Sequence, residues 1–240
     1  AVATVRVDTE KHRVVQIESA LLPTAETVVR DRGAAPAVGR WLRETQAFSQ
    51  RSVGLLSAPL SAEGDVGVSC ETSELLSAAI AEASGAKVVI HGRLSRHGVA
   101  AGKVTEGDIF ELVPYENSIG VAMLTERQLM AIIEEQVAKR ESYVACGLYG
   151  AVATFDGGGK VTHLVDRDGR PLSGRVAVAF NSYTLAGAGG RFPVLHKAVR
   201  EEDARLRDIG IGTHEVLRRY FGKHRPVEVK VKRWYQFPTD

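Results

Sequence analysis

The chain has 240 residues, of which 44% are hydrophobic and 25% are charged, and its formal charge is +2. This composition is ordinary for a globular protein with a sizeable core, arranged as one large domain or two small ones. The near balance of 31 basic and 29 acidic residues disfavours a surface for duplex nucleic acid, but it leaves a local pocket for a small anion open. No apolar run reaches the ~18–20 residues that span a bilayer.

The N-terminal part predicts a strand pair, a helix and a further strand. Residues 3–7 and 14–17 are typical of short strands around a charged turn. A helix is predicted from Pro36 to Phe48, because its apolar residues recur every three to four positions. Residues 52–58 then predict a strand.

Capping residues place three helices in the middle of the chain. The first is expected to begin at Thr72 or Ser73 and to end at Gly85, which suits a left-handed terminus. Residues 105–108 (Thr-Glu-Gly-Asp) and 125–128 (Thr-Glu-Arg-Gln) match the capping-box pattern at the start of two more. The strands predicted between these helices cover residues 87–90 and 119–124.

Strand-like segments dominate the C-terminal part. Three of them are separated by glycine turns: residues 152–155, 161–165 and 176–180. A last helix is predicted from Thr213 to Gly222, and the alternating valines of residues 227–231 suggest a closing strand. With no internal repeat and no βαβ rhythm, the prediction is an α+β fold with a mixed or antiparallel sheet and flanking helices.

The sequence lacks the motifs of a self-contained hydrolase. HExxH, GxSxG and GxxxxGK[ST] are absent, and seven scattered histidines form no Asp/His/Asn set for a dinuclear metal centre. Cys70 and Cys146 lack CxxC spacing, so we interpret them as buried thiols, with a disulfide neither supported nor excluded. We therefore expect no catalytic residue and no metal site in this chain.

Three other segments have ligand-binding character. In residues 91–96 (His-Gly-Arg-Leu-Ser-Arg), a glycine and two arginines suit an approaching phosphate, although a solvated basic loop is about as common. Residues 113–118 hold Tyr115 in a rigid turn, where it either stacks on a planar ring or packs over the sheet edge. Residues 180–192 combine an aromatic with three closely spaced glycines, which expose N–H groups or form a flexible loop.

Taken in order, these segments resemble the C-terminal domain of the 5′-nucleotidase family, which includes UDP-sugar hydrolases and cyclic-nucleotide phosphodiesterases. The matching motifs are collinear over roughly residues 60 to 232: 102–110, 114–117, 124–129, 181–183, 189–192, 214–220 and 225–227. The resemblance implies such a domain for residues 26–240. It implies that residues 1–25 are the closing strands of a metallophosphatase domain absent from these 240 residues, or a linker.

The resemblance also implies roles for individual residues. Tyr115 and Tyr183 would sandwich a nucleobase, while Asn117 and the backbone of Gly189 and Gly190 shape the pocket. Stacking of two rings is worth about 0.5–1.5 kcal/mol beyond area burial and tolerates different bases.

Arg96 stands where the family has an arginine near the phosphate. This chain departs from the family pattern at three places, and at the first of them Cys70 precedes Glu71 where the family commonly has an arginine. The family's Asn-Gly-Gly is replaced by His91, Gly92 and Arg93, and Arg191 follows the double glycine where an acidic residue usually binds ribose hydroxyls. We count both His91 and Arg191 among the candidate substrate-binding residues.

In the family, the N-terminal domain holds two divalent metal ions and the catalytic residues. The resemblance thus implies a metallophosphatase domain in cis or in trans, a nucleotide- or nucleoside-like ligand, and a periplasmic or secreted location. Three functions remain open: half of a nucleotide phosphohydrolase, a non-catalytic ligand-binding module, or an assembly domain with a vestigial pocket. The sulfur-oxidation branch of the superfamily, which hydrolyses protein-bound thiosulfonate, also stays open, although paired tyrosines favour a ring-shaped ligand.

Overall fold

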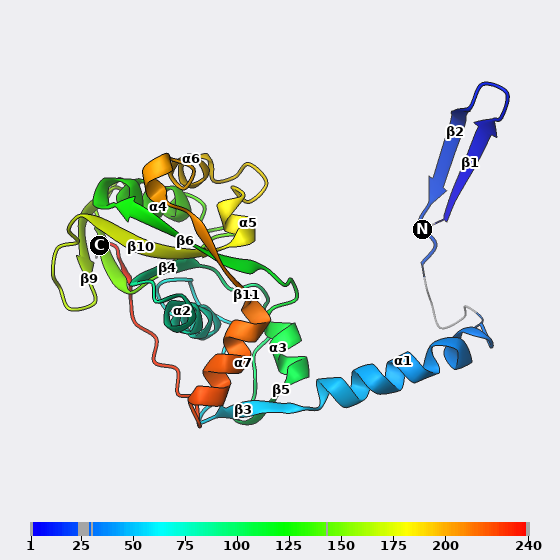
Figure 1. Cartoon of the computed structure of the whole chain (residues 1–240), viewed down its shortest axis with the longest axis horizontal. Coiled ribbons are helices and arrows are strands. Elements are labelled where there is room, and N and C mark those ends of the chain that lie inside the picture. The colour runs from blue at the N-terminus through cyan, green and yellow to red at the C-terminus, as the bar shows by residue number, and fades with distance from the viewer. Residues whose placement is uncertain (1, 24–28, 30, 143, 239–240) are drawn as a thin grey trace. The chain divides into compact units, whose positions relative to one another are not determined.

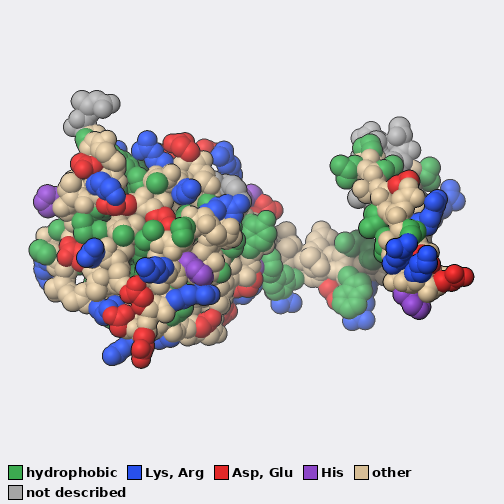
Figure 2. All heavy atoms as spheres, turned by 90° about the horizontal axis from the view of Figure 1, so that it is seen from above, with side chains coloured by type: hydrophobic (Ala, Val, Ile, Leu, Met, Phe, Trp, Pro, Cys, Tyr) green, Lys and Arg blue, Asp and Glu red, His purple; other side chains and the backbone are tan. Residues whose placement is uncertain are grey.

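The computed structural model describes residues 2–23, 29, 31–142 and 144–238, which fall into two compact units, residues 1–45 and 46–240 (Figure 1). In the first unit, β1 (Val2–Asp8) and β2 (Arg13–Ala20) form an antiparallel hairpin, and α1 (Ala34–Ser49) begins. The predicted strand pair and first helix are confirmed. The hairpin and the helix both carry exposed apolar side chains, such as Ile17 and Trp41. Figure 2 shows where hydrophobic side chains reach the surface of the molecule.

The second unit is built around a five-stranded sheet. Its strands, in spatial order, are β11 (Arg207–Gly212), β6 (Ser118–Thr125), β10 (Arg175–Asn181), β4 (Val88–His91) and β7 (Gly147–Tyr149). β10 and β4 run parallel, and all other neighbours run antiparallel. The sheet is therefore mixed, as the sequence predicted.

The central strands of this sheet are buried on both faces. On β4, Val88 and Ile90 belong to one hydrophobic core, and Val89 belongs to the other. β10 alternates in the same way, with Val178 in the first core and Ala179 in the second. Such two-sided burial explains why these strands read as continuous apolar runs in the sequence.

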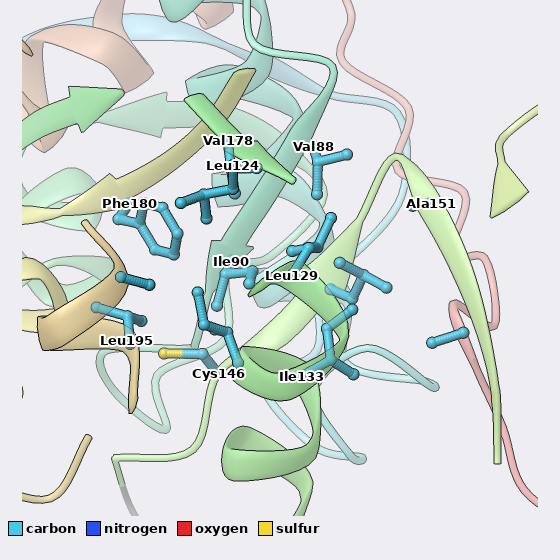
Figure 3. Close-up of a cluster of buried hydrophobic side chains, with 14 of the residues drawn as sticks. Val88, Ile90, Leu124, Leu129, Ile133, Cys146, Ala151, Val178, Phe180 and Leu195 are labelled. Atoms are coloured by element: carbon cyan, nitrogen blue, oxygen red, sulfur yellow. The ribbon is translucent and has the colours of Figure 1, made fainter. Parts of the chain in front are cut away.

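Helices and smaller strands cover each face. The first core contains α4 (Glu126–Val137), α6 (Pro193–Ala198), β8 (Ala151–Phe155), β9 (Val161–Asp166) and β12 (Tyr235–Gln236); part of it is shown in Figure 3. The second core contains α2 (Glu71–Ser84), α3 (Glu106–Leu112), α7 (Thr213–Lys223), β3 (Ser52–Leu56) and β5 (Gly102–Thr105). Two short elements complete the fold: α5 (Ser182–Leu185) and the 3₁₀ helix η1 (Glu202–Ala204).

Helix starts were predicted correctly for α3 and α4 but not for α2. Thr105 and Thr125 each form the expected capping box. α2 instead begins at Glu71, after Cys70, which makes no side-chain cap. Ser73 lies buried inside the helix, and its hydroxyl donates to the His91 carbonyl at 3.1 Å. The cap prediction was wrong because this serine is used in a tertiary hydrogen bond.

The predicted closing strand at residues 227–231 was also wrong. Only Val227 pairs there, in a single parallel bridge with Leu56. The chain then turns toward the other core, where the backbone N–H groups of Trp234 and Tyr235 both donate to the Gly67 carbonyl. The last strand therefore forms at β12, paired with β8.

Replacing Thr125 by alanine tests the contribution of a capping box. The Thr125 hydroxyl accepts the Gln128 N–H, so Thr125→Ala should lower the free energy of unfolding by about 1 kcal/mol. Thr125→Ser keeps the hydroxyl and should stay close to the wild type. Urea unfolding measures both variants, and an equal loss in the serine variant would contradict the capping role.

Candidate functional site

The three segments singled out in the sequence meet at one edge of the central sheet. β4 ends at His91 and β10, parallel to it, ends at Asn181. β6 runs antiparallel to β10 and begins at Ser118, beside Asn181. The residues after β4, after β10 and before β6 therefore lie at the same end of these strands. Loops at the carboxyl ends of parallel strands often bind ligands, so we call this end the candidate binding edge.

A hydrogen bond between side chains joins the ends of the two parallel strands. The Asn181 amide lies 3.2 Å from Nε2 of His91, and His91 Nδ1 lies 2.5 Å from the Gly92 carbonyl. Asn181 Oδ1 accepts the Thr184 N–H at 2.8 Å, which leaves the Asn181 NH₂ group to face the histidine. His91 is thus a neutral tautomer, with its proton on Nδ1.

His91 lies in the interior. Its side chain is fully buried, and burial lowers the pKa of His91 to about 4, against the opposing effect of the Gly92 carbonyl. The sequence prediction counted His91 as substrate-binding. The structure places it in the interior, where its ring is hydrogen-bonded to the Asn181 side chain.

Asn181 also caps α5, the short helix that presents Tyr183. The Thr184 N–H that its side chain accepts belongs to the first turn of α5. Our sequence interpretation treated this segment as a glycine loop and missed the cap. The signal was present, because asparagine at the end of a strand is a common helix N-cap.

Asn117 connects the Tyr115 turn to α5. Its amide nitrogen donates to the Tyr115 carbonyl at 3.2 Å, and its Oδ1 accepts the Ser182 hydroxyl at 3.3 Å. Its own carbonyl accepts from the backbone and the hydroxyl of Thr213. Asn117 therefore fixes the residues next to both predicted clamp tyrosines.

His214, which our sequence interpretation did not single out, anchors the same turn to α7. Its Nε2 lies 2.6 Å from the Val113 carbonyl, and its Nδ1 contacts the Glu116 carboxylate. Glu116 also accepts the His214 backbone N–H. Gly212 leaves room for this side chain, since a Cβ atom there would displace the Glu116 carboxylate.

The two tyrosines remain accessible on this anchored frame. Tyr115 is 69% exposed and Tyr183 is 42% exposed, and neither makes an aromatic pair with another described residue. The alternative that Tyr115 packs over the sheet edge is therefore not what the structure shows. An exposed aromatic ring on a rigid turn is available for stacking.

The glycine segment is connected to Tyr183 by Arg191, which follows the two glycines. Gly189 and Gly190 have φ values of +67° and +84°, which side chains rarely adopt, and a Cβ atom on Gly190 would meet nothing within 4 Å. Nη1 of Arg191 donates to the Ala188 carbonyl at 2.8 Å and to the Tyr183 hydroxyl at 3.4 Å. Arg191 thus contacts the predicted clamp directly.

The arginine segment after β4 has a different neighbourhood. A Cβ atom on Gly92 would lie 2.4 Å from the Ala145 carbonyl, so this glycine serves a backbone contact within the fold. Nη1 of Arg93 donates to the carbonyls of Ala62 and Gly64. Arg96 is exposed and lines a pocket of about 570 Å³. Neither Tyr115 nor Tyr183 lines that pocket.

Two expected features were searched for among the residues that the structure describes. No group of three or more His, Cys, Asp or Glu side chains there is placed to hold a metal ion. Within the same residues, no helix is both long enough and apolar enough to cross a membrane. Cys70 and Cys146 are buried free thiols, and burial raises the pKa of Cys146 to about 11.

A comparison with protein families decides the assignment. Residues 52–197 match the model of the 5′-nucleotidase, C-terminal domain. The chain belongs to this family. The matched residues include the end of β4, the Tyr115 turn and the glycine segment, whereas the anchoring Thr213 and His214 follow them in the chain.

Solved structures share the fold of this 5′-nucleotidase C-terminal domain. A 5′-nucleotidase precursor from Thermus thermophilus matches 99% of the chain with a TM-score of 0.72 at 21% identity, over 49% of its own length. The NAD nucleotidase of Haemophilus influenzae matches 98% of the chain with a TM-score of 0.67 at 13% identity, over 48% of its own length. The sulfate thiohydrolase SoxB of Thermus thermophilus matches 97% of the chain with a TM-score of 0.61 at 15% identity, over 44% of its own length.

The chain thus spans about half the length of the solved structures that it matches. At these identities the likeness establishes the fold, and it does not choose between a nucleotide and a thiosulfonate substrate. A search of curated proteins found no match.

The buried neutral state of His91 predicts a pH dependence of stability. As the pH falls from ~6.5 to ~4, unfolded His91 takes up a proton that folded His91 excludes, so the free energy of unfolding should fall by about 3 kcal/mol. Below pH ~4 this contribution should not grow further. His91→Asn should remove this part of the pH dependence, measured by urea unfolding between pH 4 and 7.

His163 provides the matched control, because it is an exposed histidine on β9. His163→Asn should keep the wild-type pH dependence. An identical slope in the wild type and His91→Asn would show that His91 is not held neutral.

Proposed function

We propose that this domain binds a nucleotide-like ligand for a phosphohydrolase, with the nucleobase held between Tyr115 and Tyr183. The observation that carries the proposal is the Asn117 bridge, which joins the turn of one exposed tyrosine to the helix of the other. Two aromatic faces held on one rigid frame suit a flat ring, and stacking accepts different bases. Order in the free protein also reduces the entropy lost on binding.

The surroundings of Tyr183 support the same ligand class. Arg191 donates to its hydroxyl, and a Cβ atom on Gly190, the residue before Arg191, would meet nothing within 4 Å. A guanidinium group near the ring edge offers donors to ribose or phosphate oxygens. In this proposal Asn117, Gly189 and Gly190 shape the pocket, Arg96 faces the phosphate side, and His91 acts indirectly through Asn181.

Hydrolysis is assigned to a metallophosphatase domain in cis or in trans. No described part of this chain offers a set of three metal-ligating side chains, so both divalent metal ions of such an enzyme would be held elsewhere. A bound metal pair would supply an activated hydroxide that attacks phosphorus. The residues of this chain would bind and orient the substrate. The family resemblance supports a periplasmic or secreted location, which cell fractionation can test.

A non-catalytic binding module is the second candidate. Arg191, which stands where the family usually has an acidic residue, favours it, because a cation there changes which ligand edge is recognised. A thiosulfonate-type substrate, suggested by the fold likeness to SoxB, is a further possibility. Binding and hydrolysis experiments separate these candidates.

Removing either ring tests the clamp. Tyr115→Ala and Tyr183→Ala should each weaken the binding of adenosine and of uridine roughly three- to tenfold, because one stacking partner is lost. Tyr115→Phe keeps the ring and should bind like the wild type. Isothermal titration calorimetry measures the affinities, and a melting curve for each variant checks the fold.

Asn117→Ala provides a second test of the clamp. It leaves both rings in place but removes the bridge, so it should weaken nucleoside binding without removing a stacking face. Unchanged affinity in both tyrosine-to-alanine variants would refute the clamp.

The division between binding and catalysis predicts no turnover by this chain alone. The purified chain should release no phosphate from AMP or UDP-glucose, even with added Mn²⁺ or Zn²⁺. Mixing with the metallophosphatase domain should restore release, and that activity should fall when Tyr183 is replaced by alanine. Phosphate release by the pure chain would overturn the assignment, and no release with the partner domain would favour the non-catalytic module.

A further inference from the structure

The pocket that Arg96 lines is a separate feature of the binding edge. It has a volume of about 570 Å³, and it lies on the β7 side, where Cys146 and Ala145 precede that strand. This volume falls within the range of small-molecule sites. Its lining comes from the segment after β4, the end of α4 and the C-terminal segment, so it forms only in the folded domain.

Gln136 gives the pocket an unsatisfied polar group. This residue of the last turn of α4 is 1% exposed and contributes to the pocket wall. Neither its amide nitrogen nor its amide oxygen has a hydrogen-bond partner among the residues that the structure describes. An unpaired buried polar group is destabilising, so a ligand that pairs with this amide would be favoured.

Positive charge is concentrated in the same wall. Four arginines line the pocket against two acids, Asp65 and Glu141, which leaves an excess of two positive charges. Arg96 and Arg233 are exposed, and neither forms an ion pair within the described part of the chain. Exposed guanidinium groups without a carboxylate partner favour an oxyanion ligand.

Arg140 and the aromatic residues complete the arrangement. Arg140 pairs with Glu141 at 3.5 Å and places its guanidinium carbon 5.5 Å from the centre of the Phe237 ring. Phe237 in turn stacks on Phe155, at 4.9 Å between ring centres. The Tyr235 hydroxyl donates to the Cys146 carbonyl. This side of the pocket is therefore built on aromatic contacts, and the Arg140–Glu141 ion pair is exposed to solvent, where ion pairs are weak.

We propose that this pocket is a second ligand site, which binds a phosphorylated small molecule. Arg96, Arg140 and Arg233 would receive the phosphate oxygens, and a rotation of Gln136 toward the ligand would give its buried amide a partner. The site goes beyond the nucleobase clamp, because neither clamp tyrosine lines it. Its ligand is a free phosphorylated compound, separate from any nucleotide held at the clamp.

Inorganic pyrophosphate is the probe for this site. Calorimetric titration of the wild-type chain should detect binding, and Arg233→Ala should weaken it roughly tenfold or more, as expected for loss of a charge-assisted hydrogen bond. Arg127→Ala is the control, because Arg127 is an exposed arginine in the first turn of α4 that does not line the pocket. This variant should bind like the wild type.

Gln136→Leu gives a result that a purely structural role would not. Removing an unpaired amide should raise the melting temperature of the free protein, while the affinity for pyrophosphate falls. Unchanged pyrophosphate affinity in both Arg233→Ala and Gln136→Leu, or no pyrophosphate binding by the wild type, would overturn the proposal.

AMP tests whether the pocket is separate from the clamp. If Arg233→Ala weakens AMP binding as Tyr115→Ala does, the pocket only receives the phosphate of a clamped nucleotide, and the proposal of a second site is overturned. If Arg233→Ala weakens only pyrophosphate binding, the pocket is a site for a free phosphate compound, as proposed. Pyrophosphate affinity should survive Tyr115→Ala, so failure of the clamp and failure of this pocket are separable.

Discussion

The hydrogen bond between His91 and Asn181 is the contact on which the binding edge depends. It joins the ends of two parallel strands, and the same asparagine caps the helix that carries Tyr183. A protonated imidazole would place a second N–H against the Asn181 NH₂ group, so the pair is satisfied only while His91 is neutral. Burial enforces this state, because it penalises the charged ring. A buried residue of the core is thus linked, through Asn181, to the helix that carries an exposed tyrosine.

The rest of the edge is also held by hydrogen bonds between elements that are distant in the sequence. Asn117 connects the Tyr115 turn to α5, and His214 connects that turn to α7 through Glu116. Each link satisfies backbone groups that a loop would otherwise leave to water, which makes the loops rigid without covering the tyrosines. A frame of this kind suits a domain that presents a ligand, because positioning contributes to catalysis only if the bound geometry is already fixed.

The sequence predicted most of the fold, because its strongest signals are local. The capping boxes at Thr105 and Thr125 and the apolar strands at β4, β6 and β10 were correct to within a few residues. The errors arose where tertiary contacts prevailed. Ser73 was read as a cap, but it bonds across to the His91 carbonyl. In the site, no spacing rule could show that His91 is interior or that His214, more than 90 residues after Glu116, supports the Tyr115 turn, because both facts depend on sheet order.

Glycines at the edge show why residue type alone is ambiguous evidence for a site. Gly92 and Gly190 both follow strands of the central sheet, and the sequence suggested a ligand for each. In the structure, Gly92 makes room for the Ala145 carbonyl, whereas Gly190 has a left-handed backbone and empty space beside it. Only the second arrangement leaves a surface for a ligand to approach.

The same distinction applies to the arginines: Arg93 is held by two backbone carbonyls, while Arg96 and Arg233 face a pocket. Which of these residues are free to meet a ligand therefore depends on the partners that the fold gives them.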